Sequence, residues 1–370
     1  MKICILVERW VGGGIENYLT SHFEHMDMQG LDIIIVTSAK ETDFFDERLN
    51  KLGIKIKELL NESAGPFVRP VVLFKKLNSY LEKESFDLIH INANNGVGLR
   101  YAKIAQKSNI PRIIVHSHNS GTGMGIGRSI KLLGHYIGKK LYMKYPTEYW
   151  ACSDLAAKWL FSPTIAKNKY SFVKNGINTE KVIFNFEKRK KIRSELGLEK
   201  KFTIGSIGRL SEQKNHAYLL NVFSELVKVR PEVKLLLIGS GELEEKLKLQ
   251  AKELSISDDV IFYGSTNDVQ MMLSAMDTFV LPSKYEGFPL VGIEAQCSGL
   301  ETIVSNLVTK KLKLTDLISF EPINSNNSNW INRLESIDYR KNREQYQEVI
   351  LNKGYDIKKT ASDLRKRYLN

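Results

Sequence analysis

The sequence predicts an α/β protein of two doubly wound domains, each built on a parallel sheet with helices on both faces. Its 370 residues leave room for two domains of roughly 150–200 residues, each with its own core. In both halves, short continuous runs of Val, Ile and Leu alternate with helical patterns. Such runs are typical of strands buried on both faces, as in parallel sheets. Because the alternation occurs in two successive series, we expect two Rossmann-like domains.

Each half contains a series of expected strands. They are Ile3–Val7, Ile33–Thr37, Leu88–Ile91, Arg112–Val115 and Tyr149–Cys152, then Phe202–Ile207, Lys234–Ile238, Val260–Tyr263, Thr278–Leu281 and Thr302–Val304. Helices are expected over Glu16–Gln29, Val71–Glu84, Ala217–Val229, Leu243–Glu253 and Val269–Ala275. The opening run has no small-residue cleavage site of a signal peptide, so we expect it to be a buried strand.

The domain boundary is expected in the turn-rich segment Val173–Asn178, after the first series of strands. Asn324–Asn329 is a second polar break, and Tyr355–Tyr368 has a helical pattern. The expected divisions are an N-terminal domain, a C-terminal domain and a C-terminal helix, at residues 1–175, 176–352 and 353–370.

The net charge of +12 is concentrated in one stretch. No acidic residue occurs between Asp87 and Glu148, whereas basic residues are frequent there. Such a surface attracts phosphates, nucleic acid or an anionic membrane, although a solvated basic face explains the charge equally well. No nucleic-acid-binding motif is present, so we expect no nucleic-acid partner.

The remaining composition indicates a cytoplasmic protein. No apolar run approaches the roughly 18 residues of a membrane span. Cys4, Cys152 and Cys297 lie far apart in apolar segments and lack metal-ligand spacing, which predicts buried thiols in a reducing compartment.

In the first half, two motifs follow expected strands. Gly12, Gly13 and Gly14 lead from the first strand into a helix, where glycines allow a ligand to approach the backbone. The dinucleotide fingerprint is broken, which disfavours a nicotinamide-dependent oxidoreductase, and a tight turn explains the glycines as well. His116 and His118 are expected on one side of a strand end, facing a ligand or forming a structural pair. A metal is disfavoured because no carboxylate lies nearby in sequence.

In the second half, Arg209 and Lys214 follow a strand and could clamp a diphosphate. The strongest signal is the run Leu281–Ala295, in which Glu286 and Glu294 stand eight positions apart. A helix beginning near Pro289 would direct its amides toward an anion. The alternatives are a structural carboxylate for Glu286 and a buried capping partner for Glu294.

Together these motifs resemble the retaining glycosyltransferases of family four, and most of all those of bacterial capsule and exopolysaccharide synthesis. The resemblance spans nearly the whole chain. The segments that carry it are Gly13–Glu16, His116–Asn119, Val173–Asn178, Gly208–Arg209 with Lys214, Leu237–Gly241, Phe262–Gly264, Asn267–Val269, Asp277, Leu281–Ser283 and Glu286 with Glu294.

The resemblance implies the GT-B architecture, in which two Rossmann-like domains face a cleft. The first domain would bind the acceptor, the second the nucleotide sugar, and the final helix would cross back to the first domain. The implied activity is hexosyl or N-acetylhexosaminyl transfer from a nucleotide-diphosphate sugar, expected to be a UDP-sugar. We expect neither a metal nor a cofactor.

The resemblance also implies a role for each matching residue. Arg209 and Lys214 would neutralise the diphosphate, Glu286 would contact the transferred sugar, and Glu294 would bind the ribose. Either His116 or His118 would lie beside the donor sugar and the acceptor. The remaining donor contacts would be the backbone or side chains of Gly13, Gly14, Gly264, Asn267, Asp268, Val269, Gly287, Phe288 and Leu290.

The acceptor is expected to be a saccharide, linked to a lipid diphosphate in one version of the hypothesis. The segment Ile126–Lys144 mixes basic, apolar and aromatic residues at helical spacing. It could rest on the anionic inner face of the plasma membrane. A helix packed on its own domain is the alternative.

One position departs from the family pattern. After Gly299 and Leu300 the family usually has proline, whereas this chain has Glu301. We expect a turn beside the nucleotide there. A weakened donor site would favour a second hypothesis, a catalytically silent partner subunit, although Arg209, Lys214, Glu286 and Glu294 argue against it.

Overall fold

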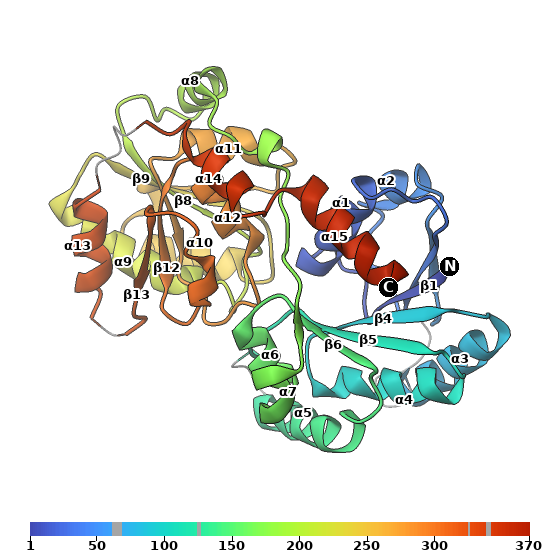
Figure 1. The fold of residues 1–370 in the computed structure, drawn as a ribbon. Helices are drawn as coiled ribbons and strands as arrows, with labels where there is room; N and C mark the ends of the chain where they lie inside the picture. Colours follow the sequence, from blue (N-terminus) through green and yellow to red (C-terminus); the bar gives the residue numbers. More distant parts are fainter. Residues whose placement is uncertain (61–68, 124–126, 325, 338–341) are drawn as a thin grey trace. The chain divides into compact units, whose positions relative to one another are not determined.

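The computed structural model describes residues 1–60, 69–123, 127–324, 326–337 and 342–370. The chain forms two compact units: unit 1 is Met1–Gly176 together with Ile357–Asn370, and unit 2 is Ile177–Asp356. Each unit contains one parallel sheet with helices on both faces (Figure 1). The predicted class of two doubly wound α/β domains is confirmed.

The sheet of unit 1 has the strand order β3-β2-β1-β4-β5-β6-β7. Its strands are β1 (Lys2–Val7), β2 (Asp32–Thr37), β3 (Lys55–Glu58), β4 (Leu88–Ala93), β5 (Arg112–Ser117), β6 (Glu148–Ala151) and β7 (Ser171–Phe172). Its helices are α1 (Gly14–Glu24), α2 (Asp46–Asn50), α3 (Arg69–Lys83), η1 (Gly96–Leu99), α4 (Arg100–Lys107), α5 (Arg128–Tyr142), α6 (Asp154–Leu160), α7 (Pro163–Asn168) and α15 (Ile357–Leu369).

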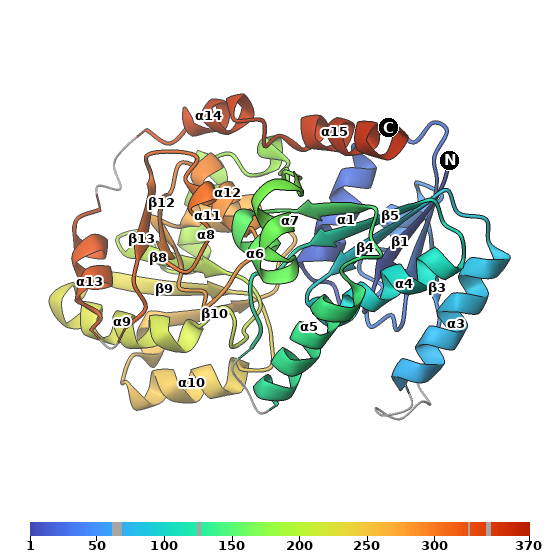
Figure 2. The ribbon, with the colours of Figure 1, turned by 60° about the horizontal axis from the view of Figure 1, so that its bottom comes forward.

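The helices of unit 1 form two layers, one on each face of its sheet. α3, α4 and α5 lie on one face, and α1, α2 and α15 lie on the other (Figures 1 and 2). On the second face, Phe23 of α1 and Leu364 of α15 share a core with Ile3 and Ile5 of β1. The C-terminal helix is therefore an integral part of unit 1, although it follows unit 2 in sequence.

The sheet of unit 2 has the strand order β10-β9-β8-β11-β12-β13. Its strands are β8 (Phe202–Ile207), β9 (Val233–Ile238), β10 (Val260–Gly264), β11 (Thr278–Leu281), β12 (Glu301–Ser305) and β13 (Ile318–Glu321). Its helices are η2 (Thr179–Lys181), α8 (Phe186–Glu195), α9 (His216–Val229), α10 (Glu244–Glu253), η3 (Ser257–Asp259), α11 (Val269–Ala275), α12 (Leu290–Cys297), η4 (Lys310–Leu312), α13 (Ser328–Glu335) and α14 (Tyr346–Asn352).

Unit 2 has the same layered plan. α9 packs against α10 and α13 on one face, and α8 with α11 and α12 with α14 pack on the other. Leu219 and Phe223 of α9 lie in a core with Ile204 of β8 and Leu235 of β9. These strand residues belong to the continuous apolar runs that predicted a sheet buried on both faces.

Every predicted strand is present, and the predicted ends are wrong by a few residues at most. The strands that the pattern missed are β3, β7 and β13, at or next to the sheet edges. Their sequences are Lys-Ile-Lys-Glu, Ser-Phe and Ile-Ser-Phe-Glu, which are too polar or too short to show a buried run. As edge strands they are paired on one side only, and most of their residues are exposed or half-buried.

Helix α1 ends at Glu24, so the predicted end at Gln29 is wrong. Asp27 Oδ1 accepts a hydrogen bond from the amide of Gln29 at 3.0 Å. This local turn competes with helix continuation.

The three cysteines are buried thiols, as predicted. Among the described residues, no helix is both long enough and apolar enough to cross a membrane. Ile126 and Ser325, which belong to the predicted segments Ile126–Lys144 and Asn324–Asn329, lie outside the described residues.

Candidate functional site

The predicted site residues of unit 2 follow the carboxyl ends of two parallel strands. Arg209 and Lys214 follow β8, and the segment with Glu286 follows β11. β8 and β11 are neighbours in the sheet, so both loops leave the same edge. The topology thus joins side chains that are 72 positions apart in sequence.

Lys214 and Glu286 form an ion pair at this edge, the lysine–glutamate pair. Lys214 Nζ lies 2.7 Å from Glu286 Oε1, and both side chains are largely buried. Ser283 Oγ donates to the same oxygen at 2.8 Å, and Gln213 Nε2 donates to Oε2 at 3.4 Å. A buried charge is tolerated when it is paired and hydrogen-bonded, and this carboxylate is both.

Two backbone features give the lysine–glutamate pair its geometry. A Cβ on Gly208 would lie 2.9 Å from Lys214 Cε, so the glycine makes room for the lysine side chain. Asn215 has φ 60°, and its side chain donates to the Pro282 carbonyl at 3.2 Å. The loop after β8 is therefore tied to the loop after β11.

Arg209 has different surroundings. Its Nε lies 3.2 Å from Glu242 Oε2, and both side chains are more than half exposed. An exposed ion pair of this kind is weak. Arg209 is therefore more exposed and more weakly paired than Lys214, and the two predicted cations do not share a partner.

Helix α12 begins at Leu290 after Pro289, where the sequence predicted a helix start. No acceptor among the described residues is assigned to the amides of Gly287, Phe288 and Leu290. Free amides at a helix start favour an anion.

Glu294 lies one turn further along α12 and is partly buried. Burial raises the pKa of its carboxyl to about 7. No hydrogen bond or ion pair to this carboxyl is assigned within the described ranges. A desolvated carboxyl without a protein partner is a candidate ligand contact.

The loop between β10 and α11 contains the predicted donor contacts Gly264, Asn267, Asp268 and Val269. Gly264 has φ +80°, and its carbonyl accepts from the Gly239 amide at 2.8 Å. Asp268 caps α11 by accepting from the Met271 amide at 2.9 Å and pairs with Lys188 at 2.7 Å. The Asp268 carboxylate therefore has a structural task, whereas Asn267 and Val269 lie beside it in the loop and at the helix start.

In unit 1, the glycine loop is held by Glu16. This buried carboxylate accepts from the amides of Val11 and Gly13, each at 3.0 Å. Gly12 has φ +77°, so the turn itself requires a glycine there. A Cβ on Gly14 would meet no atom of the described residues within 4 Å, so local packing does not explain a glycine at that position.

His116 and His118 belong to a larger group of rings, the histidine cluster, which comprises His22, His90, His116 and His118. The rings of His116 and His118 are 3.9 Å apart, so the prediction that they share a side is confirmed. His116 is fully buried and its Nδ1 lies 3.2 Å from His90 Nε2. His90 Nδ1 lies 2.8 Å from the hydroxyl of Tyr368.

His90 and Asn92 of β4 were not predicted from the sequence. Asn92 pairs with His116 across the sheet, and Asn92 Oδ1 lies 2.8 Å from His118 Nε2. A signal was present: His90 and Asn92 repeat the spacing of two residues seen for His116 and His118. Its meaning depends on the strand register, which the sequence does not display.

Burial keeps the histidine cluster neutral. It lowers the pKa of His90 and His118 to about 3 and that of His22 to about 4, because the charged form loses hydration. Nitrogens of His90, His116 and His118 lie within 4.8 Å of one another, a spacing open to a metal ion. Both nitrogens of His90 are already hydrogen-bonded, so a metal would have to displace these bonds.

Two family descriptions match the chain in sequence order. "Glycosyltransferase Family 4" matches residues 12–181, and "Glycosyl transferases group 1" matches residues 188–311. The chain is a glycosyltransferase of the family-four type.

Relatives and solved structures are similar along nearly the whole glycosyltransferase. EpsF of Bacillus subtilis (strain 168), named as a glycosyltransferase, is 27% identical over 370 residues, covering 96% of this chain and 93% of the relative. An Escherichia coli UDP-Gal:alpha-D-GlcNAc-diphosphoundecaprenol alpha-1,3-galactosyltransferase is 26% identical over 305 residues, covering 80% of this chain and 76% of the relative. The structure of Anabaena Alr3699/HepE with UDP and glucose has TM-score 0.79 at 18% identity, covering 100% and 99% of the two chains. These matches confirm the GT-B fold.

The expectation for Glu301 is wrong. Glu301 is the first residue of β12 and pairs with Thr278, the first residue of β11. It therefore lies at the amino edge of the sheet, opposite the edge with the lysine–glutamate pair. Its carboxylate pairs with Arg333 of α13 at 2.9 Å. The glycosyltransferase thus uses Glu301 to attach α13 to the sheet, not to shape a nucleotide loop.

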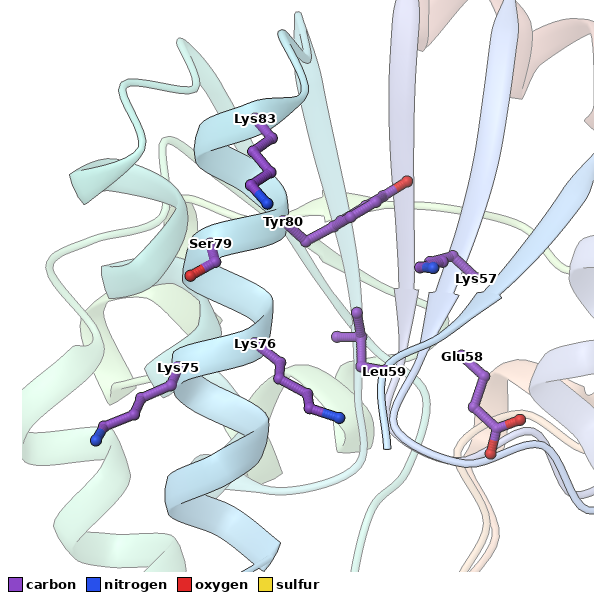
Figure 3. Close-up of a pocket in the computed structure, with 8 residues that line it drawn as sticks. All are labelled: Lys57, Glu58, Leu59, Lys75, Lys76, Ser79, Tyr80 and Lys83. Atoms are coloured by element: carbon purple, nitrogen blue, oxygen red, sulfur yellow. The ribbon is translucent and has the colours of Figure 1, made fainter. Parts of the chain in front are cut away.

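A cavity of about 430 Å³ lies elsewhere in the glycosyltransferase, between β3 and α3 of unit 1. Tyr80 and Lys76 extend from α3 toward the strands, whereas Lys75 points away (Figure 3). Lysine stems commonly cover apolar surface beside an aromatic ring. The residues predicted for the donor and acceptor do not line this cavity.

Proposed function

We propose that this glycosyltransferase moves a sugar from a UDP-sugar to a hydroxyl of a saccharide acceptor with retention of configuration. The observation that carries the proposal is the buried lysine–glutamate pair at the carboxyl edge of the unit 2 sheet. It combines a cation for the diphosphate with a carboxylate for sugar hydroxyls.

The charge of the leaving diphosphate would be stabilised by Lys214, Arg209 and the free amides at the start of α12. Preorganised donors of this kind usually supply the largest single contribution to catalysis. Glu286 would accept hydrogen bonds from the transferred sugar while Ser283 and Gln213 hold it in place. Because Lys214 binds Glu286 directly, the same pair would couple sugar position to phosphate position.

Neither carboxylate would act as a nucleophile. Glu286 is committed to three donors, and Glu294 would bind the ribose. The diphosphate would leave from the face that the acceptor attacks, and a donor phosphate oxygen would take the acceptor proton. The reaction would then need no metal and no cofactor.

Unit 1 would supply the acceptor side and a contact to the donor. Gly13 and Gly14 would let a donor phosphate approach the start of α1, and the open space beside Gly14 supports this role. His118 is partly buried whereas His116 is fully buried, which favours His118 as the residue that meets a saccharide hydroxyl.

Names of similar proteins support the choice of donor and acceptor class. The Escherichia coli relative is named for UDP-Gal and a diphosphoundecaprenol-linked sugar, and the Anabaena protein was solved with UDP-glucose. These names support the proposal that this chain acts in surface polysaccharide synthesis, with a saccharide or a lipid-linked saccharide as acceptor.

Helix α5 would hold the enzyme at an anionic membrane surface. Its exposed side chains include Ile130, Leu133, Ile137 and Leu141, which are 47–76% exposed. Their spacing of three or four residues makes one stripe on the helix. A neighbouring face of the helix is packed against its own unit: a Cβ on Gly138 would lie 2.1 Å from the carbonyl oxygen of Gly96.

The basic residues beside this stripe suit anionic headgroups. Arg128, Lys131, Lys140 and Lys144 are exposed, and none has an acidic partner within the described ranges. Apolar residues flanked by cations are typical of helices that lie in a membrane interface.

A silent partner subunit has lost its supporting observation, because Glu301 lies at the opposite edge of the sheet from the donor residues. The test of activity uses the purified protein alone with UDP-glucose, UDP-galactose and UDP-N-acetylglucosamine. A donor that binds raises the melting temperature. Transfer in the presence of a chelator, with an α-linked product from an α-linked donor by NMR, supports the proposal. Binding without transfer or hydrolysis, for every donor and acceptor tried, contradicts it.

A further inference from the structure

The side-chain amide of Asn92 has an orientation that its surroundings determine. Its Nδ2 lies 3.4 Å from the carbonyl oxygens of Leu6 and His90. Carbonyl oxygens only accept hydrogen bonds, so the amide nitrogen must face them. The other end of the amide, Oδ1, then faces His118 Nε2 at 2.8 Å.

This orientation determines which nitrogen of His118 carries the proton. An amide oxygen only accepts, so His118 Nε2 must donate to Asn92 Oδ1. In a neutral ring Nδ1 is then left with a lone pair. No partner for Nδ1 is assigned within the described part of the chain.

The rings around His118 fix its plane and supply no negative charge. Tyr18 and His22 of α1, His116 of β5, and His90 of β4 lie around it, with Arg367 of α15 near His116. No carboxylate is among these groups, and burial with the neighbouring His22 lowers the pKa of His118 to about 3. His118 is therefore a neutral acceptor.

We propose that Asn92 is a positioning residue that holds His118 in its Nε2–H tautomer, so that Nδ1 accepts a hydrogen bond from a hydroxyl of the bound saccharide. The inference rests on the proposed function for the identity of the ligand. It deepens that function, because it makes His118 an acceptor of a hydrogen bond and excludes it as a proton donor.

The sharpest test is Asn92→Asp, which keeps the shape and adds a negative charge beside His118. The carboxylate stabilises the imidazolium and raises the pKa of His118. Two-bond ¹⁵N–¹H NMR spectra of the free protein report the tautomer and the titration directly. We expect an Nε2–H ring that does not titrate between pH 5 and 8 in the wild type, and a ring that does titrate in Asn92→Asp. An Nδ1–H ring in the wild type overturns the proposal even if the variant fails to fold.

Activity supplies the second readout, with whichever of the three UDP-sugars is turned over. The wild-type kcat should show no histidine ionisation between pH 5 and 8. In Asn92→Asp, kcat should fall about tenfold for each pH unit below the raised pKa, because protonated His118 cannot accept a hydrogen bond. The matched control is Asn94→Asp, an exposed position just after the end of β4, which should keep the wild-type profile.

Parallel profiles for the wild type and Asn92→Asp, despite a titrating His118, overturn the role in the reaction. Failure of the proposed function looks different, because the wild type itself then turns over no nucleotide sugar. The tautomer seen by NMR remains measurable in that case. The two failures are therefore distinguishable.

Discussion

The two units place polar residues at the same edge of similar sheets but use opposite chemistry. In unit 2 the central feature is a full ion pair between Lys214 and Glu286. In unit 1 it is the neutral histidine cluster, in which burial lowers the pKa of His90 and His118 to about 3 and that of His22 to about 4. A leaving diphosphate needs charge, whereas an uncharged saccharide needs oriented hydrogen bonds, so the difference matches the two ligands proposed.

The comparison predicts the largest effect for Lys214→Ala. The variant removes a cation from the site of the diphosphate and should lower kcat/KM by about 10²–10³-fold. It also leaves Glu286 buried without its charged partner, so the melting temperature should fall. Steady-state kinetics with a UDP-sugar measures the first effect and differential scanning calorimetry the second.

A matched control separates the two effects. Lys284 pairs with Glu212 at 3.0 Å in a more exposed position of the adjacent loop, so Lys284→Ala should change neither quantity by much. If Lys214→Ala keeps a near-normal kcat/KM, the charge of Lys214 is not needed for transfer. The proposed contrast between a charged unit 2 site and a neutral unit 1 site is then wrong.

The contrast also explains what could be predicted from sequence. Lys214, Glu286 and Glu294 stand in loops after apolar runs, so their type and position indicate a site without knowledge of the fold. Their pairing was not predicted, because Lys214 could equally have faced solvent as Arg209 does. The choice depends on the space that Gly208 leaves.

Only part of the neutral site in unit 1 could be predicted from the sequence. His116 and His118 stood out as a pair, but His90, which contacts His116, comes from a neighbouring strand, and Tyr368, which contacts His90, comes from the last helix. Those contacts depend on strand register and on which unit α15 joins. The same limit applied to Glu301, whose sequence neighbours suggested a turn while its strand placed it at the far edge.

Unit 1 also carries positive charge, but on the exposed surface of α5 and beside an apolar stripe. This surface is proposed to bind a membrane, so it gives a second test of how the two units differ. We expect Leu133→Ser with Ile137→Ser to weaken binding to phosphatidylglycerol vesicles by about tenfold or more, because two apolar side chains no longer enter the interface. Sedimentation with vesicles measures this. Stability should stay constant, because both side chains are exposed.

Leu249→Ser is the control for α5, since Leu249 is 62% exposed on α10 of unit 2. Binding should also weaken at high salt and on phosphatidylcholine vesicles. Equal binding of the wild type and the α5 variant would exclude this face as the membrane contact. Concentration-dependent dimerisation lost in the variant would assign the face to a second copy instead.

Glu294 tests whether every polar side chain of the unit 2 site is charged. Its carboxyl is desolvated and so favours the neutral form, as the histidine rings of unit 1 do. Burial raises its pKa from 4.5 to about 7, so the folded protein binds this proton more tightly than the unfolded chain. Stability from this group is therefore full below about pH 4.5 and is lost as pH rises to about 7. In Glu294→Gln the fall in melting temperature between pH 5 and 8 should be smaller than in the wild type.

The same substitution should weaken UDP binding by roughly tenfold at pH 8, where the wild-type carboxylate is ionised and accepts from ribose hydroxyls. At pH 5.5 the difference should shrink, since the wild-type carboxyl is then protonated. Titration calorimetry with UDP at both pH values measures this. A pH-independent difference would argue that Glu294 does not contact the nucleotide.

The smallest effect on activity is expected for Glu301→Gln, at the edge of the unit 2 sheet away from the donor residues. The change breaks the ion pair with Arg333 and should lower the free energy of unfolding by about 1 kcal/mol. Because β12 separates Glu301 from the carboxyl edge, kcat and KM for the UDP-sugar should stay within about twofold of wild type. A larger kinetic change would show that α13 transmits its attachment to the donor site, and the division between a charged active edge and a structural edge would then be too simple.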